Sequence, residues 1–242
     1  MIPIPDSVEL QRDRASEAWL LKKSGEWLSK QERPAGLHAT DLLDLRRAFF
    51  RAVDPKPLGP REIGLFLPGK VLHAFVLGAA GGKVDLNATD EGAHFSEEFG
   101  LWYSPDWDRG GNIAEFKTSR AFKTPKDLSD VDIYVEQVLI YLACKNQLEA
   151  RLWCLYLNLR DEVTKRMTPT FLCFRVKISQ EDLERIKTFI RASKQDYEKA
   201  VETGDFRSLD LCRGWLCGAR MCEWYHRCRP EGRYGTKEFD AV

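Results

Sequence analysis

The stretch YSPDWDRGGNIAEFKTSR, residues 103–120, begins at the end of the apolar run of residues 99–103 and contains a glycine pair followed by a second short apolar run. Glycine pairs mark turns, and short runs bounded by turn signals are typical of strands. We therefore expect strands at about residues 99–103 and 112–116, joined by a tight connection. The stretch predicts a strand-turn-strand unit that carries several charged side chains.

Two carboxylates and a lysine make this unit a candidate metal site. Side chains alternate faces along a strand, so Glu115 and Lys117 are predicted to share a face while Phe116 points into the core. Asp106 ends the preceding strand and can reach the same point. Carboxylate oxygens suit Mg²⁺ or Mn²⁺, and an ammonium group can orient a nucleophile or offset charge on a phosphate. A surface hairpin with satisfied charges gives the same pattern, so this spacing alone leaves both interpretations open.

A second aspartate competes for the same role. Asp108 lies two residues after Asp106, so both fall on one strand face. We favour Asp106 because Ser104 and Pro105 place it at a strand end, whereas Asp108 falls in the turn.

The remaining elements predict a mixed α/β fold. Helical spacing of apolar residues favours helices at residues 38–53, 68–78, 131–147 (capped by Ser129) and 180–203, with a further helical segment at 7–31. Strands are expected at residues 151–159 and 170–178. Helices and strands alternate along the chain, which is the order of an α/β domain.

Composition limits the classes of protein that fit. A chain of 242 residues with 43% hydrophobic residues is long enough for one sizeable core. Its 37 basic and 37 acidic residues cancel, so any nucleic-acid contact must come from a local patch. No apolar run approaches the roughly 20 residues of a membrane span, and the start of the sequence lacks the layout of a secretory signal. We expect a cytoplasmic protein.

Four of the seven cysteines are crowded into LCRGWLCGARMCEWYHRC, residues 211–228. They are Cys212, Cys217, Cys222 and Cys228. In a reducing compartment such crowding favours a metal over disulfides, and the even spacing suits an iron-sulfur cluster better than the close ligand pairs of zinc sites. Cys144, Cys154 and Cys173 lie in apolar runs and are expected in the core.

Basic and aromatic residues are interleaved with these cysteines. Arg213, Arg220, Trp224 and Arg227 are candidates for binding single-stranded DNA, because guanidinium groups pair with phosphates and aromatic rings stack on unpaired bases. In the alternative interpretation, the aromatic residues pack around the cluster and the arginines are solvated.

Four elements occur in a recognisable order across residues 69–143. They are His73 in GKVLHAFV, Asp106 in YSPD, Glu115 with Lys117 in IAEFKTS, and Gln137 with Tyr141 in EQVLIYLA. In this order they resemble the RecB-type PD-(D/E)XK nuclease family, close to its CRISPR-associated iron-sulfur exonucleases. The resemblance implies a restriction-endonuclease-like core, in which a mixed central sheet is flanked by helices, with a helical N-terminal segment and a C-terminal cysteine cluster.

The resemblance also implies roles for these residues. His73, Asp106, Glu115 and the backbone carbonyl of Phe116 would bind Mg²⁺ or Mn²⁺, Lys117 would assist the attacking water, and Gln137 and Tyr141 would brace the site. A helical histidine on an apolar face is otherwise more often a core residue. The implied activity is hydrolysis of DNA by a metal-activated water, as a single-strand exonuclease or end-trimming enzyme. The implied setting is CRISPR spacer acquisition, with integrase partners, or DNA repair.

The cysteine tail departs from the family in one respect. Family members with a [4Fe-4S] cluster take the first cysteine from the helix before the histidine, but LLDLRRAFF, residues 42–50, has none. Either Cys212 replaces that ligand, or the cluster has another anchor or is replaced by Zn²⁺.

We expect a single domain over residues 1–242. It would comprise a helical N-terminal segment at 1–60, the nuclease core at 61–205 and the metal-cluster tail at 206–242. The rival hypothesis is a non-catalytic module that keeps the fold and the cluster and binds DNA or an integrase.

Overall fold

The computed structural model describes residues 34–57, 59–79, 93–109, 111–121, 125, 132–160, 164–210 and 222–228, with residues 19, 22–24 and 26. Most of the helical segment expected at residues 7–31 therefore lies outside the described residues. In the described part of the chain, no helix is long and apolar enough to cross a membrane.

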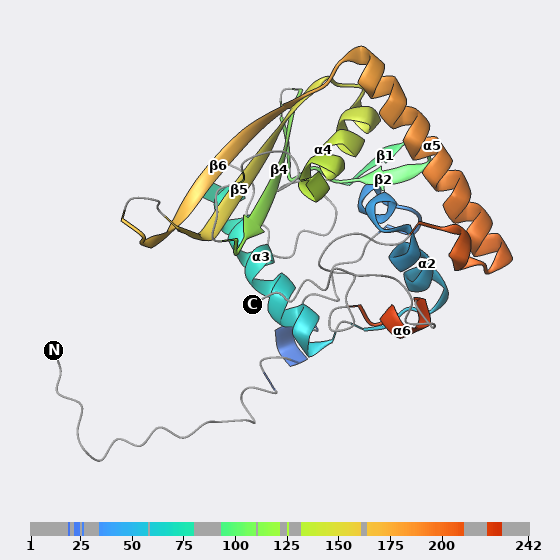
Figure 1. Cartoon of the computed structure of the whole chain (residues 1–242), viewed down its shortest axis with the longest axis horizontal. Helices are drawn as coiled ribbons and strands as arrows, with labels where there is room; N and C mark the ends of the chain where they lie inside the picture. The colour runs from blue at the N-terminus through green and yellow to red at the C-terminus, as the bar shows by residue number, and fades with distance from the viewer. Residues whose placement is uncertain are drawn as a thin grey trace.

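Helices and strands alternate along the chain (Figure 1). In order they are η1 (Ala39–Leu43), α2 (Leu45–Val53), α3 (Pro60–Ala79), β1 (His94–Ser96), β2 (Leu101–Tyr103), β3 (Trp107–Arg109), β4 (Asn112–Ser119), α4 (Asp132–Lys145), β5 (Glu149–Arg160), β6 (Met167–Lys177), α5 (Gln180–Thr203), η3 (Phe206–Ser208) and α6 (Tyr225–Cys228). β1 and β2 form a separate hairpin.

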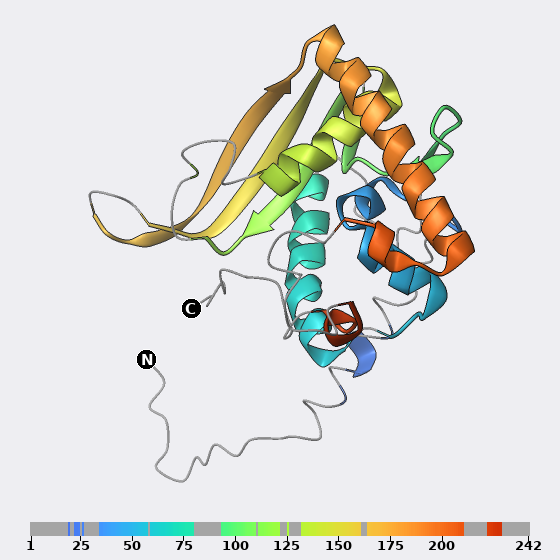
Figure 2. The same ribbon diagram turned by 45° about the vertical axis from the view of Figure 1, so that its right-hand side comes forward.

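The main sheet has the order β3-β4-β5-β6 and is mixed. β4 and β5 are parallel, and the other two pairs are antiparallel. A parallel pair needs a crossover connection, which α4 supplies. The predicted mixed α/β class, with a mixed central sheet flanked by helices, is confirmed (Figures 1 and 2).

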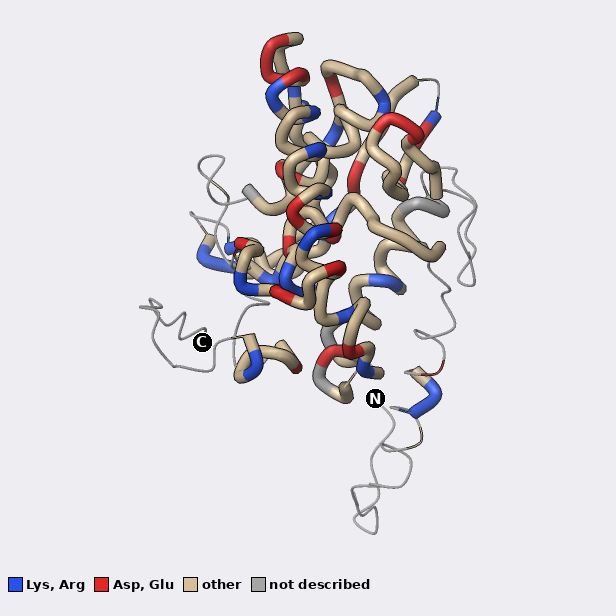
Figure 3. The backbone as a smooth tube through the Cα atoms, turned by 90° about the vertical axis from the view of Figure 1, so that its right-hand side faces the viewer, with Lys and Arg blue, Asp and Glu red and all other residues tan. Residues whose placement is uncertain are grey.

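The sheet buries one face beneath α4 and α5. Val138 and Leu142 of α4, Leu152 of β5, and Leu183 and Ile190 of α5 belong to one core cluster, and each is at most 1% exposed. Acidic and basic residues are interspersed along α5 (Figure 3). We call the sheet face beneath α4 and α5 the inner face and the opposite one the outer face.

Helix α3 packs on the outer face, at the β4 side of the sheet. The His73 and Phe116 rings lie 5.7 Å apart, and a Cβ atom at Gly69 would lie 3.4 Å from Thr118 Oγ1. Phe116 is buried, as expected, but against α3 and not in the main core cluster.

Three sequence predictions about elements were wrong. The helix predicted at 68–78 was expected to start at Pro68, because proline fits the first helical turn, where its missing N–H is not needed. In the structure this helix begins at Pro60, another proline, and Pro68 lies in its interior. The helix predicted at 38–53 divides where Asp44 caps α2 by accepting from the Arg47 N–H at 3.1 Å. The strand predicted at 99–103 pairs with β1, while β3 pairs with β4.

Candidate active site

The open edge of β4 holds Asp106 in place. β3 pairs with β4 only as far as Ala114, so in the described structure the Phe116 N–H is left to another acceptor. It donates to Asp106 Oδ2 at 2.7 Å. The N–H and C=O of one strand residue point to the same edge, so the Phe116 carbonyl also faces Asp106.

Glu115 is the buried centre of the site. It is 2% exposed, and its Oε1 atom accepts from Lys117 Nζ and from Gln137 Nε2, the latter at 2.9 Å. Its Oε2 atom is buried and has no hydrogen-bond partner among the described residues. Glu115 and Lys117 therefore share a face, as predicted, and Oε2 of Glu115 is the carboxylate oxygen without a hydrogen bond.

Asp108 lies in a different electrostatic environment from Asp106. Its Oδ2 atom is 2.5 Å from Lys145 Nζ and 3.3 Å from His94 Nε2, so its charge is compensated by the Lys145 ammonium group of α4. The structure thus brings Asp106, and not Asp108, beside Glu115.

His73 reaches the site from α3. Its Nε2 atom lies 3.1 Å from Asp106 Oδ1, which is ion-pair distance, yet it is buried and has no hydrogen-bond partner among the described residues. The nitrogen therefore lies close to the Asp106 carboxylate without forming a hydrogen bond to a described residue.

Gln137 and Tyr141 brace Glu115 from one face of α4, as their four-residue spacing requires. Gln137 Nε2 lies 2.6 Å from Tyr141 Oη, and Tyr141 donates to the Ser104 carbonyl at 3.2 Å. Ser104 precedes Asp106 by two residues, so this chain of hydrogen bonds joins both carboxylate positions.

Sequence reasoning missed Tyr134. Its ring centroid lies 6.0 Å from Lys117 Nζ, within cation-π range. The available signal was its position three residues before Gln137, on the same helical face.

Burial and mutual repulsion set the protonation of this site. Burial, and then the nearby Asp106 carboxylate, raise the pKa of Glu115 to about 8, although Lys117 opposes the shift. Burial alone would lower the pKa of Lys117, but the Glu115 and Asp106 carboxylates outweigh it and raise that pKa. Lys117 therefore stays charged, while Glu115 gains a proton in neutral solution unless another cation compensates it.

The donor set fits a divalent cation, although the ligands are not already assembled around one point. Among the described residues, no group of three or more His, Cys, Asp or Glu side chains has the arrangement of a metal site. The unpartnered Glu115 Oε2 and His73 Nε2 atoms nevertheless flank Asp106. Hard oxygen donors with one imidazole suit Mg²⁺ or Mn²⁺.

The described end of the tail packs against α2. Cys222 and Cys228 are half-buried beside Phe49 and Phe50. Arg46 Nη1 lies 3.7 Å from Cys228 Sγ. Cys212 and Cys217 lie outside the described residues, so the four-cysteine cluster stays a prediction.

Trp224 occupies the interior of this contact. It is 4% exposed, stacks on Phe50 at a centroid distance of 6.1 Å and donates to the Asp54 carbonyl at 3.2 Å. Arg227 pairs with Asp54 at 2.9 Å. These contacts favour the packing interpretation for both residues; Arg213 and Arg220 lie outside the described residues.

The other three cysteines differ from one another. Cys154 is fully buried and Cys144 half-buried, but Cys173 is exposed, so its predicted core position was wrong. A core position there requires the strand predicted at 170–178 to be covered on both faces, whereas the outer face of β6 is open at Cys173.

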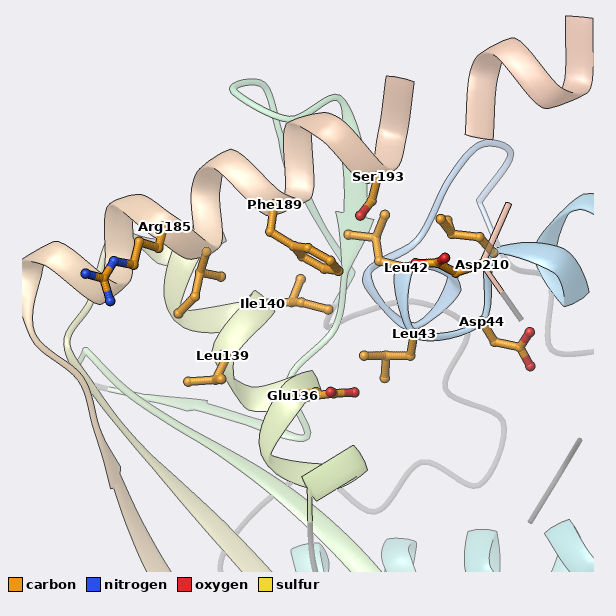
Figure 4. A pocket seen from close by; sticks show the side chains of 12 residues that line it. Leu42, Leu43, Asp44, Glu136, Leu139, Ile140, Arg185, Phe189, Ser193 and Asp210 are labelled. Atoms are coloured by element: carbon orange, nitrogen blue, oxygen red, sulfur yellow. The ribbon is translucent and has the colours of Figure 1, made fainter. Parts of the chain in front are cut away.

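A cavity of 390 Å³ lies away from these residues, between η1, α4 and α5 (Figure 4). Its wall includes Leu42, Leu139, Ile140, Phe189 and Glu136. Glu136 faces this cavity, whereas its neighbour Gln137 faces Glu115. α4 therefore separates the apolar cavity from the candidate active site.

Comparisons with known proteins assign no family. No protein-family model and no curated protein sequence matches the chain. Among solved structures, SSO0001 is 18% identical with a TM-score of 0.49, covering 78% of this chain and 88% of that one. The alkaline exonuclease LHK-Exo from Laribacter hongkongensis is 15% identical with a TM-score of 0.45, covering 76% of this chain and 97% of that one. The structure of LHK-Exo in complex with dAMP is 15% identical with a TM-score of 0.43, covering 79% of this chain and 97% of that one. At these values the likenesses assign no activity to this chain.

Proposed function

We propose that the protein is a divalent-metal-dependent deoxyribonuclease. The observation that carries the proposal is the set of buried Glu115 with the partly buried Asp106 and Lys117, in which Glu115 Oε2 has no hydrogen-bond partner among the described residues. A structural ion pair usually satisfies its buried oxygens, because an unpaired one costs about 1–3 kcal/mol. An excess of buried acid beside a charged lysine instead suits an ion that arrives with the substrate.

His73, Asp106, Glu115 and the Phe116 carbonyl would hold the ion. When bound, Mg²⁺ or Mn²⁺ supplies Lewis-acid polarisation of a phosphate oxygen and of a water molecule. The chain itself orients these ligands: the Phe116 N–H fixes Asp106, and Gln137 fixes Glu115.

Lys117 contributes positive charge at the reacting phosphate. Its raised pKa keeps the ammonium group protonated, and its position between Glu115 and the Tyr134 ring limits its movement. An ammonium group held in a water-poor site stabilises the negative charge that develops on a phosphate during hydrolysis.

The family resemblance supplies the finer proposals. They are exonuclease or end-trimming action on single-stranded DNA, a role in CRISPR spacer acquisition or DNA repair, and a [4Fe-4S] cluster. The sequence itself adds a cytoplasmic location and the four crowded cysteines Cys212, Cys217, Cys222 and Cys228 as the cluster ligands, with Cys212 in place of the family's N-terminal cysteine. Absorption near ~400 nm that disappears on cluster removal would support iron-sulfur over zinc, because d¹⁰ Zn²⁺ has no such bands.

The activity is tested with end-labelled single-stranded and duplex DNA in Mn²⁺, Mg²⁺ or EDTA. We expect metal-dependent cleavage by the wild type, and a loss of at least about 100-fold in Glu115→Ala and Lys117→Ala, since each removes charge from the reacting centre. Glu184→Gln, at an exposed acid on α5, is the matched control and should cleave normally. Equal cleavage by wild type and both site variants, or none in any metal, would overturn the proposal.

The rival function is a DNA-binding or integrase-binding module without catalysis. The observation that favours it is the lack, among the described residues, of three metal-ligating side chains already grouped together. Tight DNA binding in Mn²⁺ without any cleavage product would support this rival.

A further inference from the structure

The outer face of the sheet carries aromatic and basic side chains in register. Trp107 pairs with Ala114, which pairs with Arg151, which pairs with Arg175, so one row crosses all four strands. Paired residues lie on the same face of a sheet. This row, together with the outer-face residues next to it, forms what we call the outer-face strip.

Helix α3 leaves the strip open. It covers β4 at Phe116 and Thr118, but Arg175 is 57% exposed and Phe171 is 55% exposed. Cys173, between them on the same face, is also exposed. The strip is therefore accessible over β5 and β6.

Two tryptophans form the aromatic part of the strip. The Trp107 and Trp153 rings lie 5.8 Å apart, and both are half-buried. The Arg109 guanidinium lies 4.6 Å from the Trp107 ring centroid. Half-buried rings with one open side and a neighbouring arginine are typical of platforms on which unpaired bases stack.

The strip is strongly basic in a chain whose formal charge is zero. Arg109, Arg151, Arg175 and Lys177 contribute four positive charges and Glu149 one negative charge, which leaves a net charge of three. The hydrogen bond from Arg151 and the nearby Lys177 and Arg175 lower the pKa of Glu149, so it stays ionised. By contrast, α5 combines six acidic and five basic residues (Figure 3).

The strip ends at the edge of the sheet beside the candidate active site. Trp107 follows Asp106 directly, so the strip reaches the open edge of β4 where Asp106 accepts from the Phe116 N–H. Side chains alternate along a strand, so Glu115, which follows Ala114, points to the inner face. A polymer leaving the strip at Trp107 would thus meet Asp106 at this edge, with Glu115 just beyond it on the other face.

We propose that the outer-face strip binds single-stranded DNA and leads it to the Asp106–Glu115 site. The proposal rests on the proposed nuclease function. Trp107 and Trp153 stack on unpaired bases, while Arg175 and Lys177 pair with successive phosphates. Duplex DNA binds less well, because its bases are already stacked inside the helix and cannot reach the rings.

Binding is measured by fluorescence anisotropy of a labelled 20-nucleotide oligo(dT), in EDTA so that no hydrolysis occurs. Arg175→Gln/Lys177→Gln should lower the affinity and reduce the slope of log affinity against log salt by about 1.4, because each phosphate neutralised on a single strand accounts for ~0.7 of that slope. Trp153→Leu should weaken binding about tenfold, since the leucine cannot stack on a base. The matched control is Arg185→Gln/Lys199→Gln, which removes the same two charges from exposed positions on α5.

Unchanged affinity and salt slope in Arg175→Gln/Lys177→Gln would overturn the proposal, as would an equal loss in the α5 control or tighter binding of duplex. Because Arg175 and Lys177 are exposed, their variants remain informative if Trp153→Leu fails to fold. Strip-dependent binding without cleavage in Mn²⁺ would refute the nuclease proposal alone. Cleavage with strip-independent binding would refute the strip alone.

Discussion

Asp106 and Asp108 are the same residue type, two positions apart, yet they lie in opposite electrostatic environments. The Asp108 carboxylate faces the Lys145 ammonium group at 2.5 Å and the His94 imidazole at 3.3 Å, whereas Asp106 lies beside a buried acid, Glu115. The first arrangement pairs its carboxylate with a cation. The second has more negative charge than its neighbours compensate, which explains why burial leaves Glu115 with a raised pKa. The comparison teaches that unbalanced charge, more than the presence of acids, distinguishes a candidate site from a structural ion pair.

The largest expected effect comes from neutralising each of these two aspartates in turn. Asp106→Asn should lower the rate of DNA cleavage by about 1,000-fold or more, because it weakens an ion ligand and a charge at the reacting centre. Asp108→Asn should keep nearly full activity and lose about 1 kcal/mol of unfolding free energy, since its ion pairs are partly solvated. DNA cleavage assays measure the rates of the two variants, and urea unfolding measures their free energies of unfolding. Equal loss of activity in the two variants would show that the comparison has no functional meaning.

Metal-dependent stabilisation gives the next effect in size. Mn²⁺ at 100 times its dissociation constant should stabilise the wild type by about 2.7 kcal/mol, and Asp108→Asn by the same amount. Asp106→Asn should show little stabilisation. Thermal unfolding with and without Mn²⁺ measures the shift, with Ca²⁺ and added EDTA as controls. A wild-type unfolding temperature that does not respond to Mn²⁺ would refute the ion site.

The raised pKa of Glu115, about 8, gives a pH dependence with a definite sign. Below pH 8 the carboxyl is protonated and must release its proton when the ion binds, so Mn²⁺ affinity should rise up to tenfold per pH unit, or about 1.4 kcal/mol, and level off above pH 8. Without metal, the native state binds this proton more tightly than the unfolded chain, so the stability from Glu115 is full below the usual pKa of 4.5, falls as the pH rises from there to about 8, and is gone above it.

Calorimetry in two buffers with different ionisation enthalpies measures the released proton. Glu115→Gln should release no proton at this position and should lose the decline in stability between about pH 4.5 and 8. Proton release that is equal in Glu115→Gln and wild type would assign it to another group.

The smallest effect concerns the bracing chain on α4. Tyr141→Phe removes the hydrogen bonds to Gln137 and to the Ser104 carbonyl but keeps the ring, so the cleavage rate should fall by about tenfold or less, near 1 kcal/mol. The affinity for Mn²⁺ should change less than in Asp106→Asn. A loss as large as that of Asp106→Asn would mean that Tyr141 acts on the substrate directly.

Local patterns in the sequence predicted local structure well. Strand alternation placed Glu115 and Lys117 on one face, four-residue spacing placed Gln137 and Tyr141 together, and the bounds of the charged helix match those of α5. Each of these features depends on neighbours along the chain.

Features set by distant contacts were not predicted. The pairing of β2 with β1, the exposure of Cys173 and the burial of Phe116 beneath α3 depend on which elements meet across the fold. The same holds for Tyr134, since nothing in its own segment indicates that Lys117 lies opposite its ring. Hydrophobic periodicity gives the face of an element but not the identity of its partner.

The close approach of α3 to β4 has a consequence for how ion affinity can vary. Gly69 lies one helical turn before His73, and a Cβ atom there would already lie 3.4 Å from Thr118 Oγ1. A larger residue at 69 would move the helix outward and draw the His73 imidazole away from Asp106, although residue 69 touches no ligand. In the proposed ion site, the spacing between α3 and β4 would thus affect ion affinity, and the bulk of residue 69 would adjust that spacing.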